Sequence, residues 1–155
     1  MSYDLNFARG NTIDEVNAAL EDTDGPDCTT IEQRREVAKR LMEVEGGFEL
    51  FESPDCIELS HPKGIQVLMF GSSAAITVPY WHEGAEAVKI FEKIRFYARI
   101  LVDSFGYAIL DPQIDALITP ESIGDDQVES NDATMKMIQT HILPSVRPKS
   151  WWKFW

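Results

Sequence analysis

Four apolar runs joined by short polar links occupy residues 48–78, and they constrain the fold more than any other feature of the chain. The runs are Phe48–Glu52, Cys56–Ser60, Ile65–Phe70 and Ala75–Val78. The links are Ser53–Asp55, His61–Gly64 and Gly71–Ser73, and they are rich in turn-forming residues. Because parallel neighbours need a long crossover, links this short predict an antiparallel meander. The nearly continuous apolar run at Ile65–Phe70 predicts a central strand.

One strand and a short helix are expected at the start of the chain. Ser2–Arg9 alternates apolar and polar side chains, the pattern of a half-buried strand. The short helix is predicted from Thr12 to Leu20, with Thr12 as its N-cap and Glu15 at the position that completes a capping box.

Two stronger helices flank the meander. Thr29 and Glu32 have the spacing of a capping box at the start of the first, and Gly46-Gly47 ends it. The second is predicted over His82–Phe105, where apolar residues form a wide stripe. A last short strand is expected at Tyr107–Leu110.

The order β-α-α-ββββ-α-β predicts an α+β fold, with a mostly antiparallel sheet and helices packed on one face. We assign residues 1–143 to a single domain and residues 144–155 to a Pro-containing aromatic tail that packs back on it. Three segments with weaker patterns lie between the last predicted strand and the tail. Ile114–Ile118 is predicted as a turn or strand, Asp125–Asn131 as a loop and Ala133–Ile142 as a final helix.

The negative charge is concentrated in the first third of the chain. Residues 1–60 contain fifteen Asp and Glu against five Lys and Arg, a net −10 out of −12 for the 155 residues. Such a surface repels a phosphate backbone, so we expect no nucleic-acid binding. A basic protein is the partner that this charge favours, since complementary charge selects and accelerates encounter. The alternative is a solvated face that only aids solubility.

Nothing in the sequence indicates a membrane span or a secretory signal. The start, Met1-Ser2-Tyr3-Asp4, lacks basic residues, and no apolar run approaches the length of a transmembrane helix. The two cysteines, Cys28 and Cys56, are far apart and are expected to be free and buried, with a disulfide or a metal site as alternatives. These features predict a cytoplasmic protein.

No common catalytic or nucleotide-binding motif is present, and the sequence indicates no cofactor. One weak catalytic set remains. His82 and Glu86 are one helical turn apart, and Asp111 follows a strand end, so a small hydrolase or metal-dependent enzyme is an alternative function. Helix-start electrostatics explain Glu86 equally well, and a turn hydrogen bond explains Asp111. His61, which precedes Pro62 in a turn, is expected at the surface.

Aromatic residues are the strongest candidates for contact with a partner. Tyr80 and Trp81 lie between the meander and the long helix, where they form either a recognition site or a packed corner. Three of the four tryptophans, Trp151, Trp152 and Trp155, are in the last five residues. Burying the tail aromatics is worth on the order of 10–20 kcal/mol before chain ordering is counted. The tail is therefore expected to be covered by the domain, by a partner or second copy, or by a lipid interface.

Four short segments carry a family resemblance: Met1–Leu5, Val78–Trp81, Leu110–Gln113 and Trp151–Trp155. Together they resemble a group of small uncharacterised bacterial proteins, which commonly look like immunity or accessory proteins of polymorphic-toxin loci. The resemblance implies a protein-binding role and brings no catalytic residues. The resulting hypothesis is a non-catalytic module that holds a basic toxin or effector, with a homodimer through the aromatic tail as a further alternative.

Overall fold

The structure is a computed structural model that describes residues 2–79, 82 and 84–123. In this part of the chain, three α-helices accompany a seven-stranded antiparallel sheet, which confirms the predicted α+β class. The predicted loop at Asp125–Asn131, the predicted helix at Ala133–Ile142 and the aromatic tail lie outside the described residues.

The sheet contains the predicted meander and three further strands. The strands are β1 (Ser2–Ala8), β2 (Glu49–Glu52), β3 (Cys56–Ser60), β4 (Gln66–Phe70), β5 (Ser73–Pro79), β6 (Ala108–Asp111) and β7 (Ala116–Ile118). Their order is β2-β3-β4-β5-β1-β6-β7. The run predicted to be central forms β4, which is an interior strand. The middle position belongs to β5, because β1 adds to the meander on the far side of β5.

The first strand of the chain becomes an interior strand through long-range pairing. β1 pairs antiparallel with β5 along its length and with β6 through its second half. Phe7 lies opposite Ala74 on one side and opposite Ile109 on the other. Tyr3, Leu5 and Phe7 are buried, as the alternation predicted.

The first helix begins where the sequence predicts. In α1 (Ile13–Glu21), the hydroxyl of the N-cap Thr12 accepts a hydrogen bond from the backbone N–H of Glu15. The Glu15 carboxylate in turn accepts from the backbone N–H of Asn11 at 2.7 Å. Local sequence is therefore sufficient to place this helix start.

The second helix, α2 (Ile31–Val44), is capped one residue later than predicted. Its capping box consists of Thr30 and Gln33, so the assignment to Thr29 and Glu32 is wrong. Thr29 is instead buried, and its hydroxyl donates to the carbonyl oxygen of Gly71 at 3.0 Å. The contact with the β4–β5 link thus decides between two neighbouring threonines with similar local patterns.

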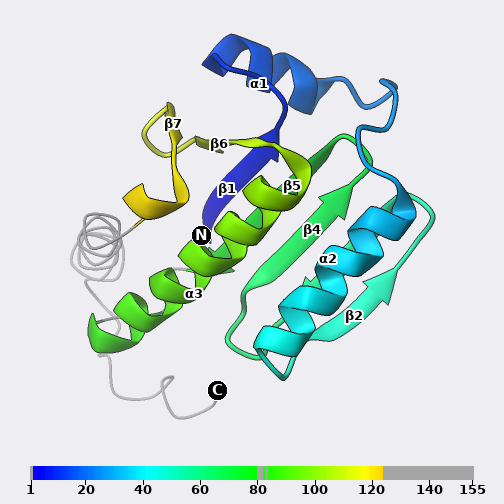
Figure 1. Cartoon of the computed structure of the whole chain (residues 1–155). Helices are drawn as coiled ribbons and strands as arrows, with labels where there is room; N and C mark the ends of the chain where they lie inside the picture. The colour runs from blue at the N-terminus through cyan, green and yellow to red at the C-terminus, as the bar shows by residue number, and fades with distance from the viewer. Residues whose placement is uncertain (1, 80–81, 83, 124–155) are drawn as a thin grey trace, which may run out of the picture.

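The two longer helices cover one face of the sheet. α3 (Gly84–Phe105) ends before Gly106, whose positive φ of 69° suits glycine. α2 and α3 lie side by side across the same face (Figure 1). The main core between these layers includes the fully buried side chains of Leu5, Leu41, Ile57 and Ile94.

The short α1 packs elsewhere. Its buried residue Val16 belongs to a second cluster with Ala8 and Leu110. Their neighbours Phe7 and Ile109 belong to the main core, and successive side chains of a strand point to opposite faces. α1 therefore packs against the sheet face that α2 and α3 leave uncovered, at the end of β1 and β6.

Both cysteines are free and half-buried. Burial raises the pKa of the Cys56 thiol, so it is less easily ionised than an exposed thiol. The expectation of free cysteines is confirmed, although their burial is only partial.

Candidate functional site

The link between β3 and β4 is the centre of a polar cluster that includes two of the predicted site residues. His82 is buried, and its Nε2 lies 2.8 Å from the carbonyl oxygen of Lys63. Its Nδ1 lies 4.0 Å from Oε1 of Glu86, the proximity that the one-turn spacing predicted. His82 and Glu86 therefore both contact the link between the strands.

Glu86 is held in its ionised form. The ammonium of Lys63 lies 2.6 Å from Glu86 Oε1, and this hydrogen bond lowers the pKa of the carboxyl group. A carboxylate with a lowered pKa is a poor proton donor at neutral pH. In this geometry Glu86 acts as an ion-pair partner for the strand link.

Glu45, at the end of α2, is a second centre of the same cluster. Its carboxylate lies 3.3 Å from His61 Nε2 and also contacts the ammonium of Lys93 and the hydroxyl of Tyr97. Burial raises the pKa of Tyr97 to about 12, so this hydroxyl remains a donor at neutral pH. The contacts join α2, the β3–β4 link and α3.

Sequence reasoning missed most of this cluster. His61 was expected at the surface, but its side chain is only 9% exposed and its ring lies edge-on to Phe48. A signal was present in the sequence: Glu86, Lys93 and Tyr97 are spaced at seven and four residues, which places them on one side of α3.

Asp111, the third residue of the predicted catalytic set, has different partners. It is 1% exposed, and its carboxylate accepts from the hydroxyl of Tyr3 at 2.7 Å and from the backbone N–H of Gln113 at 2.9 Å. The bond to Gln113 is the turn contact that the sequence offered as an alternative. The contacts of Asp111 include neither His82 nor Glu86, so nothing in this arrangement favours the hydrolase or metal-dependent alternative.

The predicted aromatic contact residues lie outside the described part of the chain. They are Tyr80, Trp81, Trp151, Trp152 and Trp155. Their role in binding stays a prediction.

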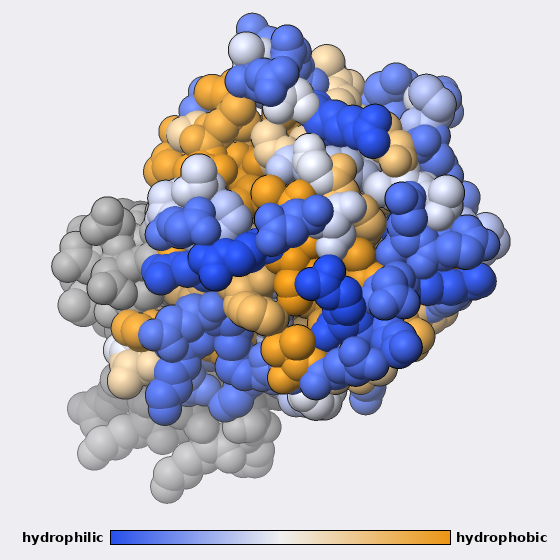
Figure 2. Space-filling view, viewed as in Figure 1, coloured by the Kyte–Doolittle hydropathy of each residue, from blue (hydrophilic) through white to orange (hydrophobic). Residues whose placement is uncertain are grey.

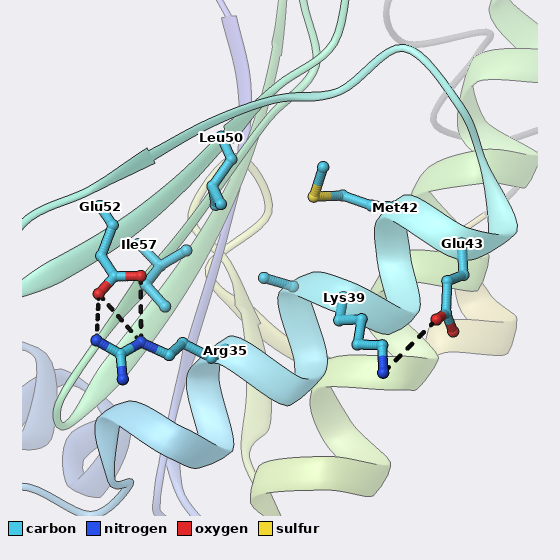
Figure 3. Close-up of a pocket in the computed structure, with 8 residues that line it drawn as sticks. Arg35, Lys39, Met42, Glu43, Leu50, Glu52 and Ile57 are labelled. Atoms are coloured by element: carbon cyan, nitrogen blue, oxygen red, sulfur yellow. Dashed lines mark hydrogen bonds and ion pairs between the residues drawn. The ribbon is translucent and has the colours of Figure 1, made fainter.

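An open groove of about 400 Å³ lies between α2 and the edge strand β2. Ala38 and Ile57 form its buried floor, and Met42 and Leu50 extend into it from opposite walls (Figure 3). Two ion pairs lie along the groove: Arg35 with Glu52 at 2.6 Å, and Lys39 with Glu43 at 3.9 Å. The hydrogen bond with Arg35 lowers the pKa of Glu52, so both groups of this pair are charged. Apolar surface between paired charges is a common composition for a protein-binding groove.

The acidic side chains of the first third lie largely in solvent. The α1–α2 link contains three exposed acids, Asp22, Asp24 and Asp27, and it follows the exposed Glu21 at the end of α1. Of these, Asp27 lies 3.7 Å from the buried Arg34, whereas Asp22 and Asp24 form no ion pair with another described residue. Over α2, hydrophilic residues dominate the surface (Figure 2). The acidic residues of the α1–α2 link are therefore exposed to solvent, whereas the hydrophilic surface of α2 includes basic as well as acidic residues.

Comparisons with protein-family models, with curated proteins and with solved structures found no match. Within residues 2–79, 82 and 84–123, no three His, Cys, Asp or Glu side chains are grouped so that they could hold a metal ion. None of the helices in the same ranges has both the length and the apolar character needed to cross a membrane.

Proposed function

We propose that this protein is a non-catalytic binding module of immunity type that holds a basic protein partner through its acidic N-terminal third. The observation that carries the proposal is the exposure of the acidic residues on the α1–α2 link, with Asp22 and Asp24 unpaired among the described residues. A basic partner can therefore approach Asp22 and Asp24 without first displacing an ion pair between described residues. A cytoplasmic location accompanies this proposal.

The physical basis is long-range charge complementarity. A net charge of −10 over residues 1–60 attracts a basic protein before contact and repels acidic competitors. Exposed charges mainly set the rate and selectivity of association, whereas buried aromatic and apolar contacts provide most of the affinity. Tyr80 and Trp81 are candidates for those anchors. The tail tryptophans are candidates for partner or homodimer contacts only if the tail is not docked on its own domain.

Direct binding to basic proteins encoded by neighbouring genes tests the proposal. We expect a purified complex whose association rate falls steeply as salt is added, because salt screens exposed charge. The double variant Asp22→Lys, Asp24→Lys should slow association severalfold. The double variant Glu92→Lys, Asp103→Lys makes the same charge change at exposed positions of α3 and is the matched control.

Two results would count against the proposal. One is the absence of binding to every basic neighbour in several genetic backgrounds. The other is a complex whose association rate responds equally to the two double variants, since net charge alone and not the N-terminal surface would then be responsible.

A further inference from the structure

Exposed apolar side chains are concentrated around the edge strand β2. Seven large hydrophobic residues are exposed in the described part of the chain, and three of them, Met42, Leu50 and Phe51, lie on β2 or in the groove beside it. Leu50 is 50% exposed and Phe51 is 64% exposed. Exposed apolar side chains grouped on a sheet edge are unusual in a monomeric protein and commonly mark a binding surface.

Both faces of β2 contribute to this surface. Leu50 lies opposite the buried Leu59 of β3 and therefore points to the helix-covered face, beside Met42 in the groove (Figure 3). Phe51 lies opposite Glu58 and points to the other face. No described strand pairs with the outer edge of β2. A segment that adds to this edge can thus place apolar side chains on both faces.

The charge around β2 identifies the kind of segment that fits. Residues 42–52 contain four glutamates, of which Glu43, Glu45 and Glu52 pair with Lys39, Lys93 and Arg35. Glu49 of β2 is exposed and forms no ion pair with another described residue. Residues 144–155 of the same chain contain Arg147, Lys149 and Lys153, no acidic residue, and four aromatic residues. In an extended strand, Trp152 and Phe154 would point to one face and Trp151 and Trp155 to the other. A basic segment can therefore pair with Glu49, and its alternating aromatic side chains match the apolar groups on the two faces of β2.

We propose that the segment 144–155 docks along the outer edge of β2, with aromatic side chains in the α2–β2 groove on one face and against Phe51 on the other. Residues 124–143 connect the last described residue to this segment, and twenty residues can span up to about 70 Å. A domain of about 120 residues has a radius of gyration of about 14 Å, so the connection is long enough to reach β2.

Tryptophan fluorescence of the full-length protein tests the docking, because three of its four tryptophans are in the segment. We expect these tryptophans to be shielded from acrylamide in the native protein. The Leu50→Asp variant should raise acrylamide quenching toward the value measured in urea. The Ile114→Asp variant places the same carboxylate at a residue of similar exposure, 57%, in the β6–β7 turn, and should leave quenching unchanged.

Phe51→Asp, on the opposite face of β2, is a second variant and should also raise quenching. Circular dichroism establishes that each variant is folded before its fluorescence is compared. Hydrogen exchange should show slow amides in residues 150–155 of the native protein and fast ones in both β2 variants.

Three outcomes would overturn the inference. Native quenching equal to that in urea would mean that the segment is not covered. Shielding that survives both β2 variants would place the segment elsewhere. A doubled mass in light scattering, with shielding that is lost on dilution, would mean that a second copy supplies the segment. All measurements use the isolated protein, so failure to find a basic partner leaves this test unaffected.

Discussion

The hydroxyl of Tyr3 donates a hydrogen bond to Oδ2 of Asp111 at 2.7 Å, between residues that are 108 positions apart. Both residues are buried, and the ring of Tyr3 also packs edge-on against Phe91 of α3 at 5.1 Å between ring centroids. One side chain thus joins β1, the end of β6 and the helix layer.

Removing this hydroxyl should destabilise the protein while leaving the packing intact. Tyr3→Phe keeps the ring beside Phe91 but removes one donor from a buried carboxylate. Hydrogen bonds to charged groups are worth about 1.5–3 kcal/mol, and we expect a loss of that size in urea unfolding. A change below about 0.5 kcal/mol would show that the bond is not structurally important.

Adjacent arginines on α2 should differ sharply in their contribution to stability. Arg34 is 2% exposed and donates to the carbonyl oxygen of Asp55 at 3.1 Å, which ties α2 to the β2–β3 link. Arg34→Met should cost about 1–3 kcal/mol in urea unfolding, because the part-buried hydrogen bond to the Asp55 carbonyl oxygen is lost. Arg35→Met is the matched control: it removes only a surface pair with Glu52, so its effect should be much smaller. Equal losses would contradict this assignment.

The position of the α2 cap can be tested by comparing Thr30 with Glu32. Thr30→Ala removes the hydroxyl that accepts from the N–H of Gln33 at 3.2 Å, and should cost about 1 kcal/mol. Glu32→Ala should have a much smaller effect, because Glu32 takes no part in the capping box. Thermal unfolding of both variants measures the difference. A larger loss in Glu32→Ala than in Thr30→Ala would support the cap predicted from the sequence.

Because of His61, the free energy of unfolding should decrease in mildly acidic solution. Burial and the nearby Lys63 lower the pKa of His61 from its ordinary value of 6.5. The backbone N–H of Lys63 donates to Nδ1 at 3.1 Å, which favours a neutral ring with its proton on Nε2, facing Glu45. The unfolded chain therefore binds a proton more readily, so the free energy of unfolding should decrease as the pH falls below about 6.5. This decrease in the free energy of unfolding should stop once the pH is below the pKa of His61 in the folded protein.

The variant His61→Gln is the control for this pH dependence, because glutamine keeps a donor toward Glu45 and does not titrate. Urea unfolding between about pH 7 and about pH 5 should show a weaker pH dependence in the variant than in the native protein. NMR titration of His61 gives its folded pKa directly. A value above 6.5 would reverse the expected sign.

Most of the local structure could be predicted because local patterns set it. The strands between Phe48 and Val78 are joined by short links of turn-forming residues. Because such links are too short for a parallel crossover, successive strands must pair antiparallel. The Thr12 cap depends on residues within one helical turn. At α2, by contrast, Thr29 and Thr30 are each followed at the third residue by a side chain able to complete a capping box. Only contact with Gly71 decides which one is buried.

In the candidate site, too, local sequence predicted some contacts, whereas others form only when distant segments pack together. The spacing of His82 and Glu86 predicted their proximity, since both depend on the start of α3. The pairing of His61 with Glu45 was not predicted, because α2 and the β3–β4 link meet only in the folded domain. The turn contact of Asp111 was one of its two predicted roles, but its bond to Tyr3 depends on β1 lying beside β6.

By itself, the sequence determined six of the seven described strands, the three described helices, the α+β class and the acidity of the first third, since these depend on periodicity, turn chemistry and composition. It left Ile114–Ile118, which contains β7, open between a turn and a strand. The tertiary structure decided that β1 lies between β5 and β6, that α1 packs against the opposite face from α2 and α3, and that Leu50 and Phe51 lie on an exposed edge. These features arise from contacts between distant segments. Such contacts depend on how whole elements pack, which no short stretch of sequence specifies.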